Sequence, residues 1–475
     1  MENDGSVAQG KYDYLVIGSG PAGFVSSITA AQLGLKVAVV QEGIDMLGGA
    51  CTNEGVIPAK SLIYDARTLN SLKRDIGLFG IEEQDIKVDM SKLVEKSRNT
   101  IIRLRKGLAG LFKKNGIDVI NGHAQFTDQY TVAVTSNNGE VSSIKADKFL
   151  IASGSVPKPL LNTPFDGSRV ISSSDAIRLS EVPKKMVIVG GGAIGVECAS
   201  LFNILGAEVT IVEYEDSLLP FEDAEISIGL RRLFEKKGII TYTASKVTNM
   251  SPLSIGLDVT IQGESAQEII NCDNVLVSTG RVPVTSTLGL EKAGVKTDDH
   301  GFIPVDNQMR TNINNIYAAG DVIPTPMLAN VAFSEGEIAA KSATGQATEM
   351  INYEAVPNVI YTEIQVASIG LTEEQAIEKK LDYSVGKQQI VGTFKSSITS
   401  DRDGFIKVIA NNDTGKLLGA HILASEAAEL IQGFIIAIKT GLTVQEIEKI
   451  IPPNPTFSES VIDACRLVFG KTVRS

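Results

Sequence analysis

The sequence predicts an α/β protein in which two similar strand–loop–helix–strand repeats precede a C-terminal α+β domain. The first observation is an internal duplication. The pattern of residues 12–40 recurs in residues 185–212, each time as two apolar strands around a glycine-rich loop and an apolar helical stretch. The second observation is a change of pattern after about Ile351, where residues 406–411 and 416–423 read as a hairpin before an amphipathic helix. The chain of 475 residues has room for about two to four domains.

Composition favours a folded protein and disfavours several functional classes. Hydrophobic residues make up 43 % and charged residues 21 %, as in an ordinary globular protein, so disorder is not expected. The 44 basic and 56 acidic residues give a net charge of −12, which disfavours binding to nucleic acid or to an anionic membrane. No stretch of about 18 apolar residues is free of charges and helix breakers, so no membrane segment is expected.

Cysteine usage and the N-terminal residues favour a cytoplasmic protein without a metal site. The four cysteines form no CxxC pair, and the three histidines are far apart, so zinc-ligand spacing is absent from the sequence. The N-terminal residues MENDGSVAQGKY are acidic and polar and do not resemble a targeting peptide. We therefore expect Cys198, Cys272 and Cys465 to be packing residues.

The two glycine-rich loops match the fingerprint of dinucleotide-binding sites. Each loop lies between a strand (YDYLVI or KMVIV) and a helical stretch. The first glycine permits a tight turn, the second lets the backbone approach a pyrophosphate, and the third lets the helix pack on the strand. The helix N-terminus then offers free N–H groups to phosphates. The glycines concerned are Gly18, Gly20 and Gly23 in the first repeat and Gly190, Gly192 and Gly195 in the second.

Further segments complete this pattern. The residue that binds the ribose in such sites is Gln41 in the first repeat and Glu213 in the second. FLIASGS (149–155) and VLVSTGR (275–281) are apolar strands that end in a small residue and a glycine. The strand IYAAG is followed by Asp321, whose carboxylate can accept hydrogen bonds from sugar or polyol hydroxyls. Between the repeats, an amphipathic helix with a solvated basic face is predicted from about Met90 to Lys114.

The segment GGACTNEGVIPAKSL (48–62) makes the chain resemble the pyridine nucleotide-disulfide oxidoreductase family, most closely the dihydrolipoamide dehydrogenases. The motifs ASGS, GGGAIGVE, STGRVP, AAGD with PMLA, YT with VASIGLTEEQA, and NPTFSE extend the resemblance over nearly the whole chain. It implies FAD on the first repeat, NAD on the second, and a homodimer. The implied domains are an FAD-binding domain in two parts (1–150 and 281–350), an NAD-binding domain (151–280) and a dimerisation domain (351–475).

The resemblance also implies individual site residues. Lys60 would lie near flavin N5 and pair with Glu197, while Cys51 and Glu459 correspond to parts of the family's thiol relay. The implied FAD contacts are Gly18, Gly20, Gly23, Gln41, Lys60, Ala124, Ser153, Gly154, Asp321, Met327, Leu328 and Ala329. The implied NAD contacts are Gly190, Gly192, Gly195, Glu197, Glu213, Val247 and Gly280.

Three positions depart from the family pattern. The family's redox disulfide joins two cysteines separated by four residues, but the partner position of Cys51 is Val56, which cannot form a disulfide. The C-terminal histidine that acts as thiol acid–base is Asn454, whose amide has no useful pKa near 7. The acidic residue expected on the FAD ribose is Gln41, and the neighbouring Glu42 is a possible substitute.

Because Val56 and Asn454 affect one mechanism, the sequence predicts an enzyme whose thiol–disulfide relay has been lost. Electrons would pass from NADH through FAD to a small-molecule acceptor that is not a disulfide, and Cys51 would be either a lone redox thiol or a residue without a redox role. Three alternatives stay open: a dihydrolipoyl dehydrogenase with atypical thiol use, a transhydrogenase-like enzyme, and a non-catalytic FAD/NAD-binding sensor or scaffold. Glu213, with no arginine in EYEDS, disfavours a 2′-phosphate and so favours NADH over NADPH.

Overall fold

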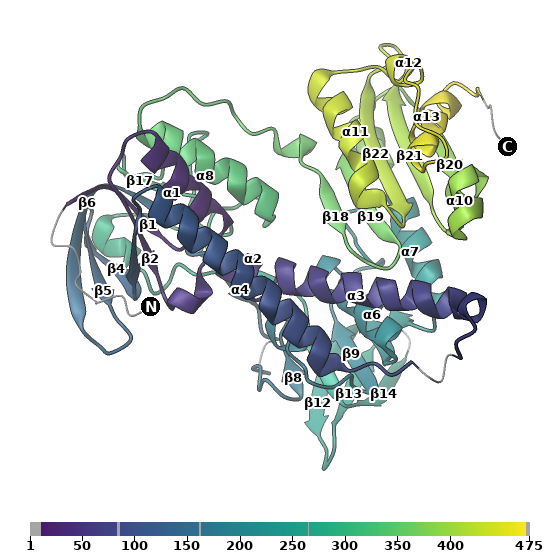
Figure 1. Cartoon of the computed structure of the whole chain (residues 1–475), viewed down its shortest axis with the longest axis horizontal. Helices are drawn as coiled ribbons and strands as arrows, with labels where there is room; N and C mark the ends of the chain where they lie inside the picture. The colour runs from purple at the N-terminus through teal and green to yellow at the C-terminus, as the bar shows by residue number, and fades with distance from the viewer. Residues whose placement is uncertain (1–10, 83–85, 161–162, 265, 472–475) are drawn as a thin grey trace. The chain divides into compact units, whose positions relative to one another are not determined.

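The computed structural model describes residues 11–82, 86–160, 163–264 and 266–471, so the acidic N-terminal segment lies outside the description. The chain divides into two compact units, and each is built from three stretches of sequence. The first unit takes Met1–Ser61, Lys92–Lys158 and Gly280–Tyr353, and the second takes Leu62–Ser91, Pro159–Thr279 and Glu354–Ser475. Both units mix helices and sheets, which confirms the predicted fold class (Figure 1).

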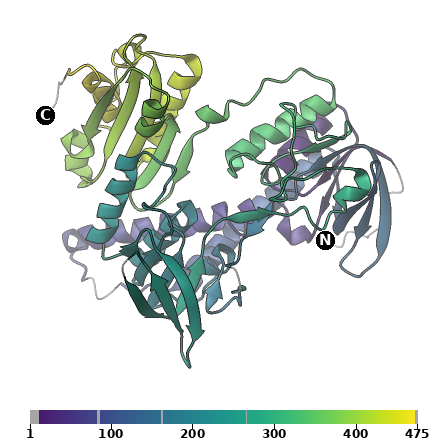
Figure 2. The same ribbon diagram turned by 180° about the vertical axis from the view of Figure 1, so that it is seen from behind.

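The first unit is built on a parallel sheet whose central strand is the first strand of the first repeat. The parallel strands, in spatial order, are β3 (Asp118–Asn121), β2 (Val37–Gln41), β1 (Tyr12–Ile17), β6 (Val141–Ile151) and β17 (Ile316–Ala318). Helices α1 (Pro21–Gln32) and α8 (Ala329–Ala343) run side by side against this sheet in both views (Figures 1 and 2). Strands β1 and β2 are mostly apolar, as expected of strands with both faces buried.

Antiparallel strands and helices complete the first unit. Strand β6 extends into a hairpin layer with β5 (Thr131–Thr135) and β4 (His123–Asp128). The other elements are η1 (Ile44–Met46), α2 (Gly49–Asn53), α4 (Met90–Lys114), the antiparallel pair β7 (Ser155–Pro157) and β16 (Arg281–Pro283), and η4 (Leu290–Ala293). Helix α4 has the predicted bounds, and η4 contacts β4.

The second repeat forms the parallel sheet of the second unit. Its strands, in spatial order, are β11 (Ile240–Tyr242), β10 (Glu208–Val212), β9 (Lys185–Val189), β15 (Asn274–Val277) and β8 (Val170–Ile171). The surrounding elements are α5 (Ser173–Ala176), α6 (Ala193–Leu205), α7 (Ala224–Lys236) and an antiparallel sheet of β12 (Lys246–Pro252), β13 (Leu257–Gln262) and β14 (Gln267–Cys272). The strand KMVIV and the helix ending at Leu205 are therefore confirmed.

The C-terminal part of the second unit is an antiparallel sheet covered by helices, as Figure 2 shows. The strands, in spatial order, are β18 (Asn358–Ile360), β19 (Gln365–Gly370), β22 (Leu417–Ala424), β21 (Phe405–Asn411) and β20 (Tyr383–Gln389). The helices are α9 (Glu373–Glu378), α10 (Phe394–Thr399), α11 (Ala427–Thr440), α12 (Val444–Ile447) and α13 (Ser458–Leu467). The predicted hairpin is β21–β22, and α11 ends at Gly441 in a left-handed conformation with φ of 70°.

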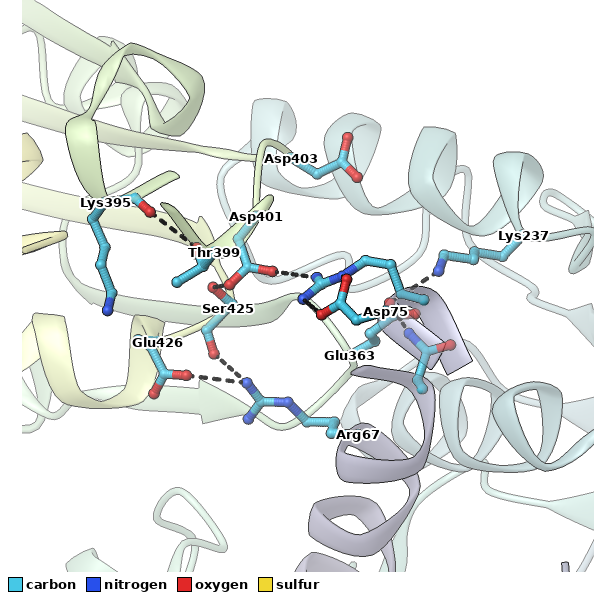
Figure 3. Close-up of polar contacts among 12 residues, drawn as sticks. Arg67, Asp75, Lys237, Glu363, Lys395, Thr399, Asp401, Asp403, Ser425 and Glu426 are labelled. Atoms are coloured by element: carbon cyan, nitrogen blue, oxygen red, sulfur yellow. Dashed lines mark hydrogen bonds and ion pairs between the residues drawn. The ribbon is translucent and has the colours of Figure 1, made fainter. Parts of the chain in front are cut away.

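Helix α3 (Val56–Asp75) continues across the boundary between the units, and its second half contacts the C-terminal sheet domain (Figure 3). Arg67 Nη2 donates to the backbone oxygen of Ser425 at 2.6 Å. Asn70 Nδ2 donates to Glu363 Oε1 at 2.6 Å, and the same oxygen accepts from Lys237 Nζ at 2.9 Å. Glu363 therefore links α3 to the end of α7 and to the C-terminal sheet.

Within the described ranges, no helix is long and apolar enough to cross a membrane.

Candidate functional site

The first glycine-rich loop has the packing and the open space that a bound pyrophosphate needs. Gly18 has φ of 98°, and a Cβ atom there would lie 2.3 Å from the backbone oxygen of Ala152. A Cβ atom at Gly23 would lie 2.0 Å from the oxygen of Gly18, whereas one at Gly20 would meet nothing within 4 Å. Helix α1 begins at Gly20 without a side-chain cap, so its N–H groups are offered to a ligand.

The second glycine-rich loop repeats this geometry in the second unit. Gly190 has φ of 107°, and a Cβ atom there would lie 2.6 Å from the backbone oxygen of Ser278. A Cβ atom at Gly195 would lie 1.9 Å from the oxygen of Gly190, and one at Gly192 would meet nothing within 4 Å. Helix α6 also begins without a side-chain cap. Both loops therefore fit a dinucleotide, and the assignment of FAD to the first unit and NAD to the second stays a prediction.

The residues at the ends of β2 and β10 hold these loops in place. Gln41 Oε1 accepts from the backbone N–H of Ser19 at 3.0 Å and from the Ser19 hydroxyl at 2.6 Å. The buried Glu213 carboxylate accepts from the backbone N–H groups of Gly191 and Glu215, the latter at 2.8 Å. Gln41 and Glu213, which occupy equivalent positions in the two repeats, thus both accept backbone N–H groups of their own glycine-rich loops.

Three predicted FAD-side residues lie close together in the first unit. Burial and the charge of Asp321 raise the pKa of the Cys51 thiol to about 11, although Lys60 partly opposes this shift. Cys51 is in α2, Lys60 is in the first turns of α3, and Asp321 follows β17, so the fold brings together three distant segments. At neutral pH the Cys51 side chain is therefore a thiol and not a thiolate.

Ser155 and Arg281 belong to the same cluster, and sequence analysis did not select either residue. Ser155 Oγ donates to Asp321 Oδ2 at 2.5 Å. Arg281 donates from Nε to Ser155 Oγ at 2.7 Å and from Nη2 to the Ser155 backbone oxygen at 2.6 Å. Burial lowers the pKa of Arg281, while Asp321 and Glu54 act in the opposite direction. Ser155 is the last residue of the motif ASGS, and Arg281 lies in the motif STGRVP. These motifs were the features of the sequence from which both residues could have been selected.

The remaining predicted FAD contacts also belong to the first unit. Ser153 Oγ donates to the backbone oxygen of Val284 at 2.6 Å, and a Cβ atom at Gly154 would meet nothing within 4 Å. Ala124 is buried in β4. Met327, Leu328 and Ala329 lead into α8, for which Leu328 is the N-cap residue. Val56 is the first residue of α3, and its side chain is 39 % exposed.

In the second unit, Glu197 of α6 is held by the C-terminal domain. The backbone N–H of Tyr361 donates to Glu197 Oε1 at 2.9 Å, and Glu197 is buried. Val247, in β12, is another predicted NAD contact of this unit, while Gly280, with φ of 120°, is the first residue of a first-unit segment. The expected pair of Lys60 and Glu197 joins residues of different units and stays a prediction.

Asn454, in the loop that precedes α13, contacts Glu459 in the first turn of that helix. Asn454 Nδ2 donates to Glu459 Oε1 at 2.6 Å, and the backbone N–H of Thr456 donates to Glu459 Oε2 at 3.3 Å. The Glu459 carboxylate is 1 % exposed. The amide thus keeps a hydrogen bond to the carboxylate but supplies no group that exchanges protons near neutral pH.

Comparison with known proteins identifies relatives over nearly the whole chain. The family model "Pyridine nucleotide-disulphide oxidoreductase" matches residues 12–336, and the model of that family's dimerisation domain matches residues 356–465. Mitochondrial dihydrolipoyl dehydrogenase of Pisum sativum is 36 % identical over 97 % of this chain and 92 % of its own length. Leghemoglobin reductase of Glycine max is 36 % identical over 97 % of this chain and 88 % of its own length.

Solved structures show the same fold. LpdA of Mycobacterium tuberculosis superimposes with a TM-score of 0.88 at 26 % identity, covering 95 % of this chain and 99 % of that one. The Cu(II) complex of the HOCl-induced flavoprotein disulfide reductase RclA of Escherichia coli superimposes with a TM-score of 0.86 at 28 % identity, covering 97 % of this chain and 100 % of that one.

Proposed function

Because the chain belongs to the pyridine nucleotide-disulphide oxidoreductase family, we propose that it transfers electrons from NADH through FAD to an acceptor that is not a disulfide. The chain is an enzyme close to dihydrolipoamide dehydrogenase, in a family whose members bind FAD and NAD(H). The observation that carries the proposal is Val56 at the start of α3, where the family pattern has the second redox cysteine. An isopropyl side chain can neither form a disulfide nor hold electrons.

Two further observations support this proposal. The raised pKa of Cys51, about 11, keeps the remaining thiol protonated, so it is a poor nucleophile for disulfide exchange at neutral pH. Asn454 donates a hydrogen bond to Glu459, but its amide cannot move a proton to or from a thiol. The chain therefore lacks the partner cysteine and the acid–base group that a thiol relay needs.

The mechanism assigns binding and orientation to the chain. Bound FAD supplies the two-electron redox chemistry. The open backbone at Gly20 and the start of α1 would hold the pyrophosphate of FAD, and Gly192 with the start of α6 would do the same for NAD. Asp321, which accepts from Ser155, would accept hydrogen bonds from the polyol chain of FAD. Lys60 would place a positive charge beside the flavin, and its pairing with Glu197, whose carboxylate accepts the N–H of Tyr361, stays a prediction.

The name of one relative supports an acceptor other than a disulfide, because the soybean relative is a leghemoglobin reductase. The Escherichia coli relative is named a flavoprotein disulfide reductase, and its structure is a Cu(II) complex. For this chain, we place the acceptor among quinones, dyes, oxygen, metal ions and small electrophiles.

The proposal includes the arrangement of domains and subunits. The proposed domains are residues 1–150 and 281–350 for FAD, 151–280 for NAD, and 351–475 for dimerisation. The match of residues 356–465 to the family's dimerisation domain supports a homodimer. We place the enzyme in the cytoplasm, although several of its relatives are mitochondrial. A sedimentation experiment that finds monomers at micromolar concentration would contradict the dimer.

The proposal is tested by an anaerobic NADH titration of protein that has been treated with a thiol reductant. One equivalent of NADH should bleach the flavin absorbance. With Val56 in place of a second cysteine, the flavin is the group that accepts the two electrons. No thiolate–flavin charge-transfer band should appear once NAD has been removed. A requirement for two reducing equivalents per flavin would reveal a second redox centre and refute the proposal.

The same sample separates the alternative functions. Efficient oxidation of dihydrolipoamide would favour a dihydrolipoyl dehydrogenase that uses an atypical thiol. Transfer of hydride between NADPH and NAD would favour a transhydrogenase-like enzyme. A yellow protein that NADH does not bleach would favour a sensor or scaffold. A screen of quinones, dyes and metal ions against the reduced enzyme then identifies the acceptor class.

A further inference from the structure

The hydrogen bonds around Gln41 use up its capacity to accept hydrogen bonds from a ribose. A side-chain amide oxygen has two lone pairs, and here the N–H and the hydroxyl of Ser19 occupy both, at 3.0 and 2.6 Å. The Ser19 hydroxyl is itself fixed, because its oxygen accepts the backbone N–H of Gly48 at 3.1 Å. Gln41 Nε2 donates to the backbone oxygen of Glu42 at 2.9 Å. Gln41 can therefore offer a ribose one N–H donor and no acceptor.

The equivalent residue of the second repeat does not have this limit. Glu213 also accepts two hydrogen bonds from its own loop, from the N–H groups of Gly191 and Glu215. A carboxylate, however, has about four acceptor positions, so about two are left for the hydroxyls of a ribose. The replacement of a carboxylate by an amide at position 41 thus removes the acceptor in the first repeat but leaves the loop contact intact.

Glu42 supplies a carboxylate at the same end of β2. His123 Nδ1 lies 3.1 Å from Glu42 Oε2, and Nε2 of the same ring lies 3.2 Å from the backbone oxygen of Thr287, so a ring with a hydrogen on each nitrogen donates to both oxygens. The backbone around the pair is fixed, because the N–H of Gly122 donates to the oxygen of Gln41 and the N–H of Gly43 donates to Asn121 Oδ1, both at 3.1 Å. His123 takes one of the acceptor positions of Glu42, whose side chain is 70 % exposed and so accessible to a ligand.

We propose that Glu42, oriented by His123, accepts hydrogen bonds from the adenosine ribose hydroxyls of FAD in place of residue 41. His123 is the first residue of β4 and directly precedes Ala124, another residue assigned to FAD. The pair therefore lies next to Gln41 and Ala124, two positions that the family resemblance assigns to FAD. The inference rests on the placement of FAD in the first unit under the proposed function.

The first test measures FAD binding to the apoprotein by fluorescence quenching. Glu42→Gln should weaken FAD binding by about tenfold or more, because a charge-assisted hydrogen bond is lost. His123→Ala should weaken it by about threefold, and His123→Gln, which keeps a donor, should stay near the wild type. Glu140→Gln, an exposed carboxylate in the turn before β6, is the matched control and should change nothing. Wild-type affinity in Glu42→Gln would overturn the proposal, and wild-type affinity in His123→Ala would overturn the role of His123.

A second test identifies the group on FAD that Glu42 contacts. The wild type should bind an FAD analogue with a 2′,3′-dideoxy adenosine ribose about as weakly as Glu42→Gln binds FAD. Glu42→Gln should bind FAD and the analogue about equally, because each change removes the same interaction. If Glu42→Gln weakens binding of both ligands by the same factor, Glu42 does not contact the ribose. The melting temperature of the apoprotein should not change, since an exposed ion pair contributes little to stability.

Gly20→Val separates this inference from the proposed placement of FAD. Gly20 has φ of −63°, which valine can adopt, and a Cβ atom there meets no protein atom within 4 Å. The valine should therefore fill the pyrophosphate space and abolish FAD binding without unfolding the chain. Retained FAD would refute both the placement and the inference. If Gly20→Val loses FAD but Glu42→Gln binds FAD with wild-type affinity, the role of Glu42 is refuted and the placement of FAD stands.

Discussion

The substitution Lys407→Met should destabilise the second unit, because Lys407 is a buried cation surrounded by carboxylates. Lys407 Nζ lies 2.9 Å from both carboxylate oxygens of Asp223, 3.2 Å from Glu225 Oε1 and 2.5 Å from Glu373 Oε2. Lys407 is 1 % exposed and Asp223 is 0 % exposed. Lys407 is in β21, whereas Asp223 is the N-cap residue of α7. The cluster thus joins α7, which follows the second repeat, to the C-terminal sheet.

The expected loss of stability is about 3 kcal/mol, at the lower end of the 3–5 kcal/mol range for a broken buried ion pair. The substitution leaves the Asp223 carboxylate buried without Lys407. Part of the penalty is offset, because the backbone N–H groups of Glu225 and Glu373 still donate to Asp223 at 3.1 and 3.2 Å. Lys387 also still pairs with Glu225.

The effect should depend on pH with a defined sign. Burial raises the pKa of Asp223, but His421, Lys407 and the N–H of Glu373 reverse this effect and leave the pKa below its usual value. Its contribution to stability is therefore present above about pH 4 and is lost as the pH falls further. Burial lowers the pKa of Lys407, but Glu373 and Asp223 raise it overall, so its contribution is present below about pH 10 and is lost at higher pH. Lys407→Met should therefore cost most between about pH 5 and 10.

The assay is urea unfolding of the holoenzyme at pH 7, with Lys416→Met as the matched control, because Lys416 is an exposed lysine near the end of the same hairpin. The free energy of unfolding should fall by about 3 kcal/mol in Lys407→Met and by less than about 0.5 kcal/mol in the control. Asp223→Asn in the Lys407→Met background should recover part of the loss, because it removes the unpaired charge. If Lys407→Met is as stable as Lys416→Met, the buried ion pair contributes nothing and the reasoning is wrong.

Three further predictions concern the cofactor sites. The wild type should prefer NADH to NADPH in kcat/KM, and Glu213→Ala should reduce that preference; equal efficiency of the two nucleotides in the wild type would contradict the assignment of Glu213 to the ribose. Val56→Cys alone should not restore efficient oxidation of dihydrolipoamide, because residue 454 is still Asn. The double variant Val56→Cys with Asn454→His should restore it. High turnover of the single variant would show that no histidine is needed. The rate at which iodoacetamide alkylates Cys51 should rise about tenfold per pH unit from about pH 7 to pH 10. The reason is that a pKa of about 11 leaves about one Cys51 side chain in ten thousand as thiolate at pH 7. A rate that does not depend on pH would refute that pKa.

Local patterns in the sequence were sufficient to predict the repeats, the hairpin and the long helix. Apolar strands, glycines that must adopt positive φ, and a 3.6-residue period are properties of short segments. Helix α4 from Met90 to Lys114 and strand β9 from Lys185 to Val189 accordingly match their predicted bounds. The glycines of both loops also show the close contacts that their spacing predicted.

The electrostatic properties of the site depend on the tertiary structure, because they arise from burial and from neighbours far apart in the sequence. Arg281 contacts Ser155, which is 126 residues away, and Ser155 contacts Asp321, which is 166 residues away. Lys407 reads as an ordinary strand residue in the sequence, yet it is a buried cation once Asp223 is placed beside it. The sequence predicted Gln41 as a ribose contact, whereas in the folded loop the N–H and hydroxyl of Ser19 donate to its amide oxygen.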